Sequence, residues 1–397
     1  MQIPFSDRLM SLTGYAFAEV DKKVVELKAR GITPIDFGIG DPSEPTPEVV
    51  RRALQKAVDA RATSGYPSYI GAPEFRHMVA TWTKLRFGVD LNPETEICSS
   101  IGAKEAVFHF PFAILNPGDV VIVPNPGYPP YVRGTQFAGG EVFYVNLLPG
   151  NNFLPDLASI PEDVLRRAKI MWINYPNNPT GALAPLEFLK DVVVFGHKHS
   201  IIIASDEPYT ENYFGSEKPH SILEVAKEGV VAFHSLSKRS CMTCYRVGWV
   251  AGDERIIAAF KKFKTNIDSG TPTFVQDAAI AALSDESHVA AFRELIREKR
   301  NLIVDALVAA GLPECRPEAT LYIWQRIPKG MTSVEFATKL LDPSIAVVVT
   351  PGNWISAEVN GINPGEGYVR LALVPSKEEC RVAEDKIKKL EMLLGLG

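Results

Sequence analysis

The segment Ser235-Leu236-Ser237-Lys238, with Arg246 eight residues after the lysine, contains the groups needed to bind a phosphorylated aldehyde covalently. A lysine ε-amine can condense with a carbonyl carbon, as in other cases of covalent catalysis by lysine. The hydroxyls of Ser235 and Ser237 and the guanidinium of Arg246 are donors that suit a phosphate group. Serine–lysine pairs are common on protein surfaces, so the segment is informative only together with the residues that accompany it.

Asp206 follows the apolar run Ile201–Ala204, which predicts a carboxylate at the carboxyl end of a strand, where open α/β sheets bind ligands. Opposite a protonated pyridine nitrogen at about 4 Å, it would contribute roughly 4 kcal/mol at an effective dielectric constant of 20. That energy equals about three pKa units, enough to keep the ring cationic at neutral pH. A cationic ring is the electron sink that carbanion chemistry on amino acids requires. Capping of a helix is the alternative role for this carboxylate.

Two further side chains could donate to a phenolate-like oxygen on such a ring. Asn178 lies in an Asn-Pro-Thr-Gly turn after the predicted strand 170–174, and Tyr209 follows Asp206 by three residues. Two donors would stabilise the oxyanion and lower the pKa of an adjacent imine, which favours its deprotonated form. Since asparagine, proline and glycine all favour turns, Asn178 could also serve the turn alone.

Tyr128 and Arg370 complete the set of candidate ligand contacts. Tyr128, in Asn125-Pro126-Gly127-Tyr128-Pro129, offers a flat face for ring stacking, although turn packing would also explain it. Arg370 lies in a predicted strand between two apolar residues, and a buried arginine needs an anionic partner. A substrate carboxylate fits the fork of the guanidinium, and an internal salt bridge is the alternative.

Gly102 and its neighbours form a turn between a predicted strand and a helix, in Ser100-Ile101-Gly102-Ala103-Lys104-Glu105-Ala106. Glycine permits close approach of the backbone, and the free amides of a helix start attract an anion. The turn matches neither a complete GxGxxG pattern nor a Walker pattern, which argues against a nucleotide site.

Short β-rich runs alternate with helical segments between about residues 95 and 252. Near-continuous apolar strands separated by helices predict an α/β fold with a mostly parallel, seven-stranded sheet sandwiched by helices. The seven runs are Glu96–Ser100, Val120–Pro124, Glu141–Asn146, Ile170–Asn174, Ile201–Asp206, Val230–Ser235 and Arg246–Ala251.

The pattern changes after about residue 285 and predicts a smaller α+β domain. A charged amphipathic helix at 289–307 precedes short strands at 321–326, 346–349 and 367–373 and a lysine-rich helix at 377–394. A helix within 7–30 and a strand at 35–39 are expected to complete this domain. We therefore predict a large domain of residues 46–285 and a small domain of residues 1–45 and 286–397.

Bulk composition excludes several classes of function. The 397 residues are 46% hydrophobic and 22% charged with a net charge of −5, as in ordinary globular proteins, and the basic residues are scattered. No footprint for nucleic acid or for an anionic membrane is expected. No apolar run is long enough to span a bilayer, and no secretory signal is visible.

The cysteines favour a reducing environment and no metal site. Five cysteines, an odd number, favour a cytoplasmic location over a disulfide framework. Cys241 and Cys244 form a lone Cys-x-x-Cys, for which packing in a turn is favoured over a redox or zinc role.

The motifs, taken in order, resemble those of the pyridoxal-phosphate-dependent aminotransferases of class I/II, the aspartate aminotransferase-like family of fold type I. The resemblance covers nearly the whole chain, from Gly38-Ile39-Gly40-Asp41-Pro42 to Arg370. The motifs that carry it are Asn174-Tyr175-Pro176-Asn177-Asn178-Pro179-Thr180-Gly181, Asp206-Glu207-Pro208-Tyr209, Ser235-Leu236-Ser237-Lys238 and Tyr368-Val369-Arg370.

The resemblance implies a role for each candidate residue. Lys238 would bind the cofactor aldehyde and later move the substrate α-proton, while Asp206 would pair with the pyridine nitrogen. Asn178 and Tyr209 would contact the ring hydroxyl, and Tyr128 would stack on the ring. The phosphate would be bound by Gly102, Ala103, Lys104, Ser235, Ser237 and Arg246. Arg370, with Asn178 and the Gly40 backbone, would bind the substrate α-carboxylate.

The resemblance also implies a homodimer with shared active sites. Tyr66, five residues before Gly71, matches the family tyrosine that reaches the phosphate bound by the partner subunit. One departure is Cys244, where the family usually has glycine two residues before the arginine. His109 could face the substrate, but packing on its helix is favoured.

Among subfamilies, the chain most resembles enzymes that transaminate LL-diaminopimelate or its acylated relatives, with glutamate and 2-oxoglutarate as the second pair. The stretches 14–17 (Gly-Tyr-Ala-Phe) and 365–370 (Gly-Glu-Gly-Tyr-Val-Arg) suggest this substrate. Two alternatives remain. Aspartate and alanine aminotransferases share the same central motifs, and a pyridoxal-phosphate-dependent carbon–sulfur β-lyase would use the same ring contacts. A DNA-binding regulator with this fold is disfavoured, because no residues remain for a DNA-binding module.

Overall fold

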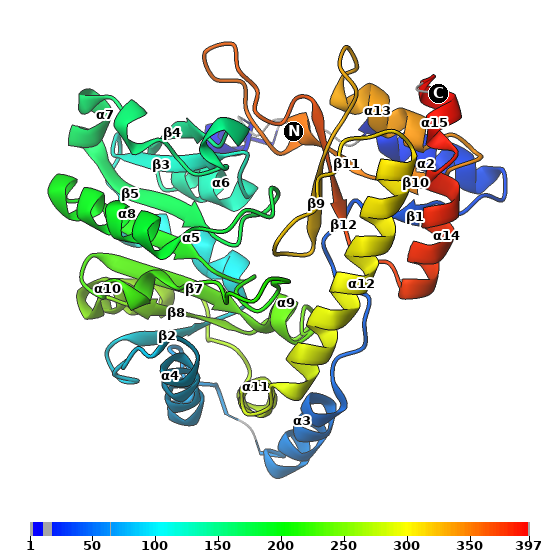
Figure 1. The fold of residues 1–397 in the computed structure, drawn as a ribbon. Helices are drawn as coiled ribbons and strands as arrows, with labels where there is room; N and C mark the ends of the chain where they lie inside the picture. Colours follow the sequence, from blue (N-terminus) through cyan, green and yellow to red (C-terminus); the bar gives the residue numbers. More distant parts are fainter. Residues whose placement is uncertain (1–2, 11–17, 64, 396–397) are drawn as a thin grey trace.

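The computed structural model describes residues 3–10, 18–63 and 65–395, and its largest element is a seven-stranded sheet (Figure 1). The strands are β2 (Ile97–Ser100), β3 (Val120–Asn125), β4 (Glu141–Asn146), β5 (Ala168–Asn174), β6 (Ile202–Asp206), β7 (Val230–Ser235) and β8 (Gly248–Gly252). Their order is β2-β8-β7-β6-β5-β3-β4, and β8 runs antiparallel to the other six strands. The predicted α/β class with a mostly parallel sheet is confirmed.

Helices cover both faces of this sheet because its strands carry apolar side chains on both sides. In β3, Val121 and Val123 pack in one buried cluster, whereas Val120 and Ile122 pack in another, as the two-residue period of a strand requires. The first face is covered by α5 (Ala103–Ile114), α6 (Pro129–Phe137) and α10 (Glu254–Lys264). The second is covered by α4 (Pro73–Phe87), α8 (Leu186–His199) and α11 (Thr273–Leu283).

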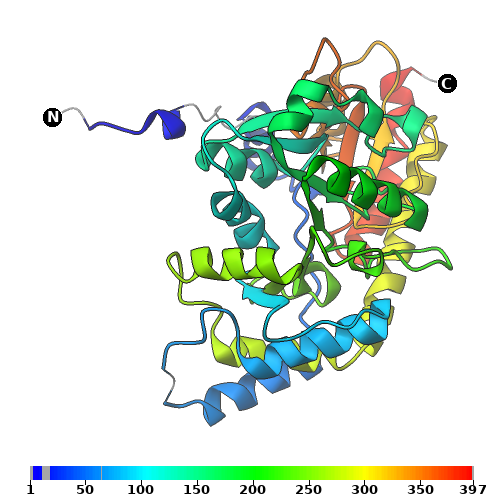
Figure 2. The ribbon, with the colours of Figure 1, turned by 90° about the vertical axis from the view of Figure 1, so that its left-hand side faces the viewer.

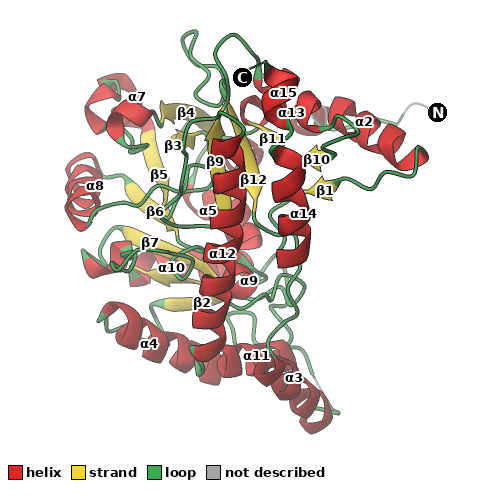
Figure 3. Cartoon of the chain, turned by 45° about the vertical axis from the view of Figure 1, so that its right-hand side comes forward, coloured by secondary structure: helices red, strands yellow, loops and turns green. Residues whose placement is uncertain are grey.

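A second, smaller set of strands lies beside the long helix α12 (Ser287–Ala309) (Figures 1 and 3). Its antiparallel sheet has the order β11-β12-β9, and β1 pairs with β10 in parallel. The elements are β1 (Ile35–Asp36), β9 (Tyr322–Arg326), β10 (Val347–Val348), β11 (Thr350–Pro351), β12 (Tyr368–Ala372), α2 (Ala18–Ala29), α13 (Ser333–Leu340), α14 (Lys377–Ile387) and α15 (Leu390–Leu394). The single terminal helix predicted at 377–394 is therefore wrong, since it is divided at Lys388 and Lys389.

The remaining helices are α1 (Asp7–Met10), α3 (Glu48–Ala60), α7 (Glu162–Arg167) and α9 (Leu236–Arg239). Figure 2 shows residues 3–10, which include α1, standing away from the main body. Across the described part of the chain, no helix has the length and apolar character needed to cross a membrane.

Candidate active site

A cavity of about 940 Å³ opens at the carboxyl ends of the central parallel strands, beside β9 and β12. Twelve of the fourteen candidate site residues line it: Gly40, Ala103, Lys104, Tyr128, Asn178, Asp206, Tyr209, Ser235, Ser237, Lys238, Arg246 and Arg370. These positions are spread over 330 residues of the chain, from 40 to 370. The fold therefore brings groups with phosphate-binding, ring-binding and carboxylate-binding chemistry into one cavity.

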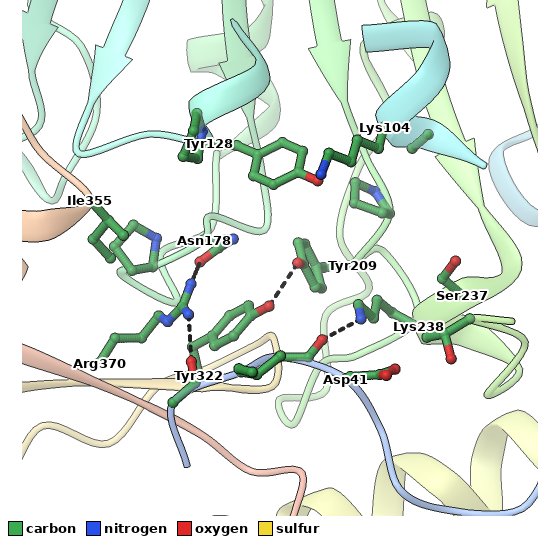
Figure 4. A pocket seen from close by; sticks show the side chains of 18 of the residues that line it. Asp41, Lys104, Tyr128, Asn178, Tyr209, Ser237, Lys238, Tyr322, Ile355 and Arg370 are labelled. Atoms are coloured by element: carbon green, nitrogen blue, oxygen red, sulfur yellow. Dashed lines mark hydrogen bonds between the residues drawn. The ribbon is translucent and has the colours of Figure 1, made fainter. Parts of the chain in front are cut away.

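Lys238 reaches the cavity from α9, the short helix that follows β7 directly. The Ser235 side chain caps this helix by accepting a hydrogen bond from the Ser237 amide, at 3.1 Å. The Lys238 ammonium donates to the Gly40 carbonyl (Figure 4). Burial lowers the pKa of Lys238 to about 8, although nearby Asp41 opposes the shift. The neutral, nucleophilic form of this amine is therefore more populated near physiological pH than that of an ordinary lysine.

Asp206 lies at the end of β6, and its side chain is buried against the cavity. Its Oδ2 accepts a 2.6 Å hydrogen bond from the Tyr131 hydroxyl, and its Oδ1 is buried without a partner among the described residues. Burial raises the pKa of Asp206 to about 7, while the Tyr131 hydrogen bond and His234 oppose the rise. A cationic group in the cavity would satisfy the free oxygen and return the carboxylate to its charged form. The site thus fits the protonated ring nitrogen of pyridoxal phosphate.

Tyr131 was not identified from the sequence, although it holds this carboxylate. Its ring is buried and stacks on Trp172 with the centroids 4.8 Å apart. Burial, followed by the nearby Asp206 charge, raises the pKa of Tyr131 well above its ordinary value, so the phenol remains a donor. The only signal in the sequence was its position three residues after Tyr128, one helical turn away.

The other end of the cavity has the donors that a phosphate requires. Gly102 has φ +72°, and a Cβ atom there would collide with the Arg246 guanidinium. Arg246 donates to the carbonyl oxygens of Thr243 (2.7 Å) and Ile101 (3.3 Å), and the Ser235 hydroxyl donates to that of Ser237 at 2.9 Å. Gly102 therefore lies just behind the cavity wall, where it leaves space for the arginine. This end of the site fits an anionic group.

Arg370 lies on β12 and points into the cavity from the side opposite the seven-stranded sheet (Figure 4). It donates from Nη1 to Asn178 Oδ1 at 3.2 Å and from Nη2 to the Gly38 carbonyl at 2.9 Å. Its Nε is buried without a partner among the described residues. Nη2 also lies 3.4 Å from the Thr350 hydroxyl. Among the described residues these partners are all uncharged, so the internal salt bridge considered from the sequence is not found there. The positive charge remains available for a carboxylate.

Three tyrosines form the walls between these two ends. Tyr128 lines the cavity, with its ring edge-to-face against Tyr131. The hydroxyls of Tyr209 and Tyr322 lie 3.1 Å apart, and both side chains are buried. Tyr322 was not identified from the sequence, where it is one aromatic residue among several in an apolar strand.

Four other positions noted in the sequence differ in their relation to the cavity. Tyr66 is 88% exposed and does not line it. His109 is hydrogen-bonded through Nδ1 to Glu105 at 3.0 Å, away from the cavity, in agreement with the favoured packing role. Cys244 is exposed and lines the cavity, and all five cysteines are free. The stretch 14–17 lies outside the described residues.

Comparisons with known proteins agree with this geometry. The family model for aminotransferase class I and II matches residues 32–387. The LL-diaminopimelate aminotransferase of Aquifex aeolicus is 47% identical over 98% of this chain and 99% of the relative. That of Nitratidesulfovibrio vulgaris (Hildenborough) is 45% identical over 97% and 98% of the two chains.

Two solved structures have the same fold. Apo-BacF from Bacillus subtilis has a TM-score of 0.91 at 34% identity and covers 98% of this chain and 99% of its own. A single mutant of Thermus thermophilus aspartate aminotransferase has a TM-score of 0.89 at 30% identity, with coverages of 98% and 100%. With a family match over most of its length and relatives above 40% identity, the chain belongs to the class I and II aminotransferases, pyridoxal-phosphate-dependent enzymes that transfer amino groups.

Proposed function

We propose that this aminotransferase moves an amino group between LL-diaminopimelate and 2-oxoglutarate in two successive half-reactions. The observation that carries the proposal is the identity of 43–47% to several LL-diaminopimelate aminotransferases over nearly their full length. When bound, pyridoxal phosphate supplies an aldehyde that takes up the amino group and a ring that accepts the electron pair of the substrate α-carbon.

Lys238 carries the proton transfer in this proposal. Its Nζ would hold the cofactor through the aldehyde and would be a free amine once a substrate amine occupies that position. This amine would accept the proton from the substrate α-carbon and return it within the same half-reaction. Burial favours this role because it lowers the pKa of Lys238 to about 8, close to the operating pH of a general base.

The ring and its phosphate are proposed to be held by the residues described above. Asp206 would pair with the ring nitrogen, and Tyr128 would pack on the ring face. Asn178 and Tyr209 would donate to the ring hydroxyl. The phosphate would be bound by Gly102, Ala103, Lys104, Ser235, Ser237 and Arg246. The buried, unpartnered Oδ1 of Asp206 and the space left by Gly102 for Arg246 support this assignment.

Arg370 is proposed to bind the substrate α-carboxylate together with Asn178 and the Gly40 backbone. The hydrogen bond of 3.2 Å between Arg370 and Asn178 already joins two of these groups. Because every α-amino acid has this carboxylate, the contact orients the α-carbon beside Lys238 without selecting a side chain.

A half-reaction panel tests the substrate assignment. Holoenzyme mixed with one amino acid at a time should lose its visible absorbance fastest with LL-diaminopimelate and glutamate. Aspartate and alanine should react at least about tenfold more slowly, because the side-chain pocket would be left partly unfilled. DD-diaminopimelate is the matched control, since it has the same groups with the opposite configuration at the α-carbons.

Two results of the panel would contradict the proposal. Aspartate or alanine as the best donor would indicate an aminotransferase for those amino acids. Release of ammonia and pyruvate from cystathionine, added to the panel because it has a carbon–sulfur bond at its β-carbon, without an acceptor acid would indicate a carbon–sulfur β-lyase.

We also propose that the enzyme is a cytoplasmic homodimer built from a large domain (46–285) and a small domain (1–45 and 286–397). Tyr66 is 88% exposed, and the N-terminal segment exposes Ile3, Phe5 and Met10 by 60% or more, as expected for surfaces that contact a partner subunit. In the dimer, Tyr66 would reach the phosphate bound by the other subunit. The free cysteines support the location.

Sedimentation equilibrium should give twice the chain mass of 43.6 kDa. A hybrid of one Lys238→Ala subunit and one Tyr66→Phe subunit would contain one site with both wild-type residues. That site should bind pyridoxal phosphate with wild-type affinity, whereas both sites of the Tyr66→Phe dimer should bind it more weakly. Equal affinity in the hybrid and in the Tyr66→Phe dimer would contradict the sharing of sites.

A further inference from the structure

Tyr322 on β9 touches two residues to which different tasks were assigned above. Its hydroxyl lies 3.1 Å from the Tyr209 hydroxyl, and the Arg370 guanidinium carbon lies 4.7 Å from the centre of its ring. Figure 4 shows Tyr322 between these two side chains. The side chain is only 3% exposed, so both contacts are shielded from water.

The backbone fixes Tyr322 in this position. In the antiparallel pair of β9 and β12, Arg370 lies opposite Trp324, so Tyr322 is its diagonal neighbour on the same face of the sheet. The Tyr322 hydroxyl packs against Gly40, where any added Cβ atom would collide with it. The Gly40 carbonyl in turn accepts the hydrogen bond from Lys238. Tyr322 therefore has little freedom to leave this contact.

The direction of the hydrogen bond follows from the assigned role of Tyr209. If the Tyr209 hydroxyl donates to the ring oxygen of the cofactor, its own oxygen accepts from Tyr322. Burial raises the pKa of Tyr209 well above its ordinary value, so its proton is retained. In such a chain, each donor polarises the next and strengthens its bond. A cation over the ring of Tyr322 attracts the ring electrons and makes its hydroxyl a stronger donor.

Other charged and titratable groups surround this pair. The charges of Asp206 and Tyr128 raise the pKa of Tyr209, and the charge of Arg246 lowers the pKa of Tyr128. Lys238 and Asp41 lie on the opposite wall of the cavity (Figure 4). Among the cationic side chains of the described residues, Arg370 is the one that lies over the Tyr322 ring.

We propose that Tyr322 is a positioning residue that transmits binding of a carboxylate at Arg370 to the hydrogen bond donated by Tyr209. The inference rests on the function proposed above for Arg370 and Tyr209. A bound carboxylate neutralises Arg370, weakens the Tyr322–Tyr209 donor chain, and raises the proton affinity of the bound cofactor group. By linkage, the protonated holoenzyme binds a carboxylate more tightly than the deprotonated form by the same factor. The substrate thereby prepares the site for proton transfer as it docks.

The test is a pH titration of the visible absorbance of the holoenzyme, with and without saturating glutarate, a dicarboxylate that has no amine to react. In the wild type, glutarate should raise the pH at the midpoint of the absorbance change. In Tyr322→Phe, which keeps the ring beneath Arg370, the midpoint without glutarate should already be higher, by about a threefold change in proton affinity. The further shift with glutarate should fall to half of the wild-type shift or less.

Tyr209→Phe provides a second, independent variant, because it removes the same hydrogen bond from the other side and should also reduce the glutarate shift by at least half. Tyr213→Phe is the matched control. Tyr213 is also buried and lies beneath an arginine, with Arg293 3.9 Å from its ring centre, but it does not line the cavity. Its titration should match that of the wild type.

The outcomes separate this inference from the proposed function. A full glutarate shift in either Tyr322→Phe or Tyr209→Phe would overturn the inference and leave the assigned role of Arg370 intact. A wild-type holoenzyme whose midpoint ignores glutarate would overturn the role of Arg370 itself and the inference with it. Failure of Tyr213→Phe to match the wild type would overturn the inference, since any buried tyrosine would then give the effect.

Discussion

Replacing Lys238 with alanine is expected to lower the transamination rate by at least about 10⁴-fold, because it removes both the covalent anchor and the proton carrier. The visible absorbance of the imine formed with Lys238 should disappear as well. Single-turnover kinetics with LL-diaminopimelate measures the first effect, and a spectrum of the purified protein measures the second. The protein should still fold, since the Lys238 side chain projects from the short helix α9 into the cavity (Figure 4).

Borohydride provides the decisive readout for this position. Reduction of the wild-type holoenzyme should fix the cofactor to the peptide that contains residue 238, as detected by peptide mass. Lys190→Ala is the matched control, because Lys190 is an exposed lysine on α8 that pairs with Glu187 at 2.6 Å. This variant should keep the adduct and the activity. A reduced adduct on any lysine other than Lys238 would refute the assignment.

Asp206→Asn should lower the rate by about 10³-fold while leaving the cofactor covalently bound. The variant keeps the size of the side chain but removes the charge opposite the ring nitrogen. A Coulomb contribution of roughly 4 kcal/mol corresponds to this factor, since each tenfold change costs about 1.4 kcal/mol. Loss of the charge should also weaken pyridoxal phosphate binding, which equilibrium dialysis measures. An unchanged rate would show that the ring nitrogen needs no anionic partner here.

The same substitution should stabilise the apoprotein at alkaline pH. Burial raises the pKa of Asp206 from 3.8 to about 7, so the folded chain binds a proton that the unfolded chain has already lost. The free energy of unfolding of the wild-type apoprotein should therefore fall as pH rises from about 4 to about 7. Above this range, Asp206→Asn should be more stable by up to ~4 kcal/mol. Urea unfolding of both apoproteins at pH 5 and pH 8 measures the difference.

Much of the fold could be predicted from the sequence because its strands are short, apolar and separated by helices. Val120–Asn125 is buried at all six positions, and such a run predicts a strand covered on both faces. The end of each strand then indicated where polar residues would gather, which is why Asp206 and Asn178 could be assigned to one edge. Lys238 and Arg246 could be assigned to one site because they are only eight residues apart, and both lie in the short connection between β7 and β8.

Tyr131 and Tyr322 could not be found in this way. Tyr131 meets Asp206 across 75 residues, and Tyr322 meets Tyr209 across 113 residues. Each contact depends on how a helix or a strand from another part of the chain is oriented, which a local pattern does not encode. In sequence, a buried tyrosine that donates a hydrogen bond has the same appearance as one that only packs.

The single antiparallel strand of the large sheet has a consequence for the chemistry. Since β8 runs against β7, the chain leaves the sheet at Ser235 and re-enters it at Gly248 on the same edge. The amine of Lys238 and the guanidinium of Arg246 are therefore both carried by one short excursion of a dozen residues. If β8 were parallel to β7, a crossover connection running back along the length of the strands would have to lie between Lys238 and Arg246. The distance between the Lys238 amine and the Arg246 guanidinium is therefore set within this short connection. Other parts of the fold can move without changing it.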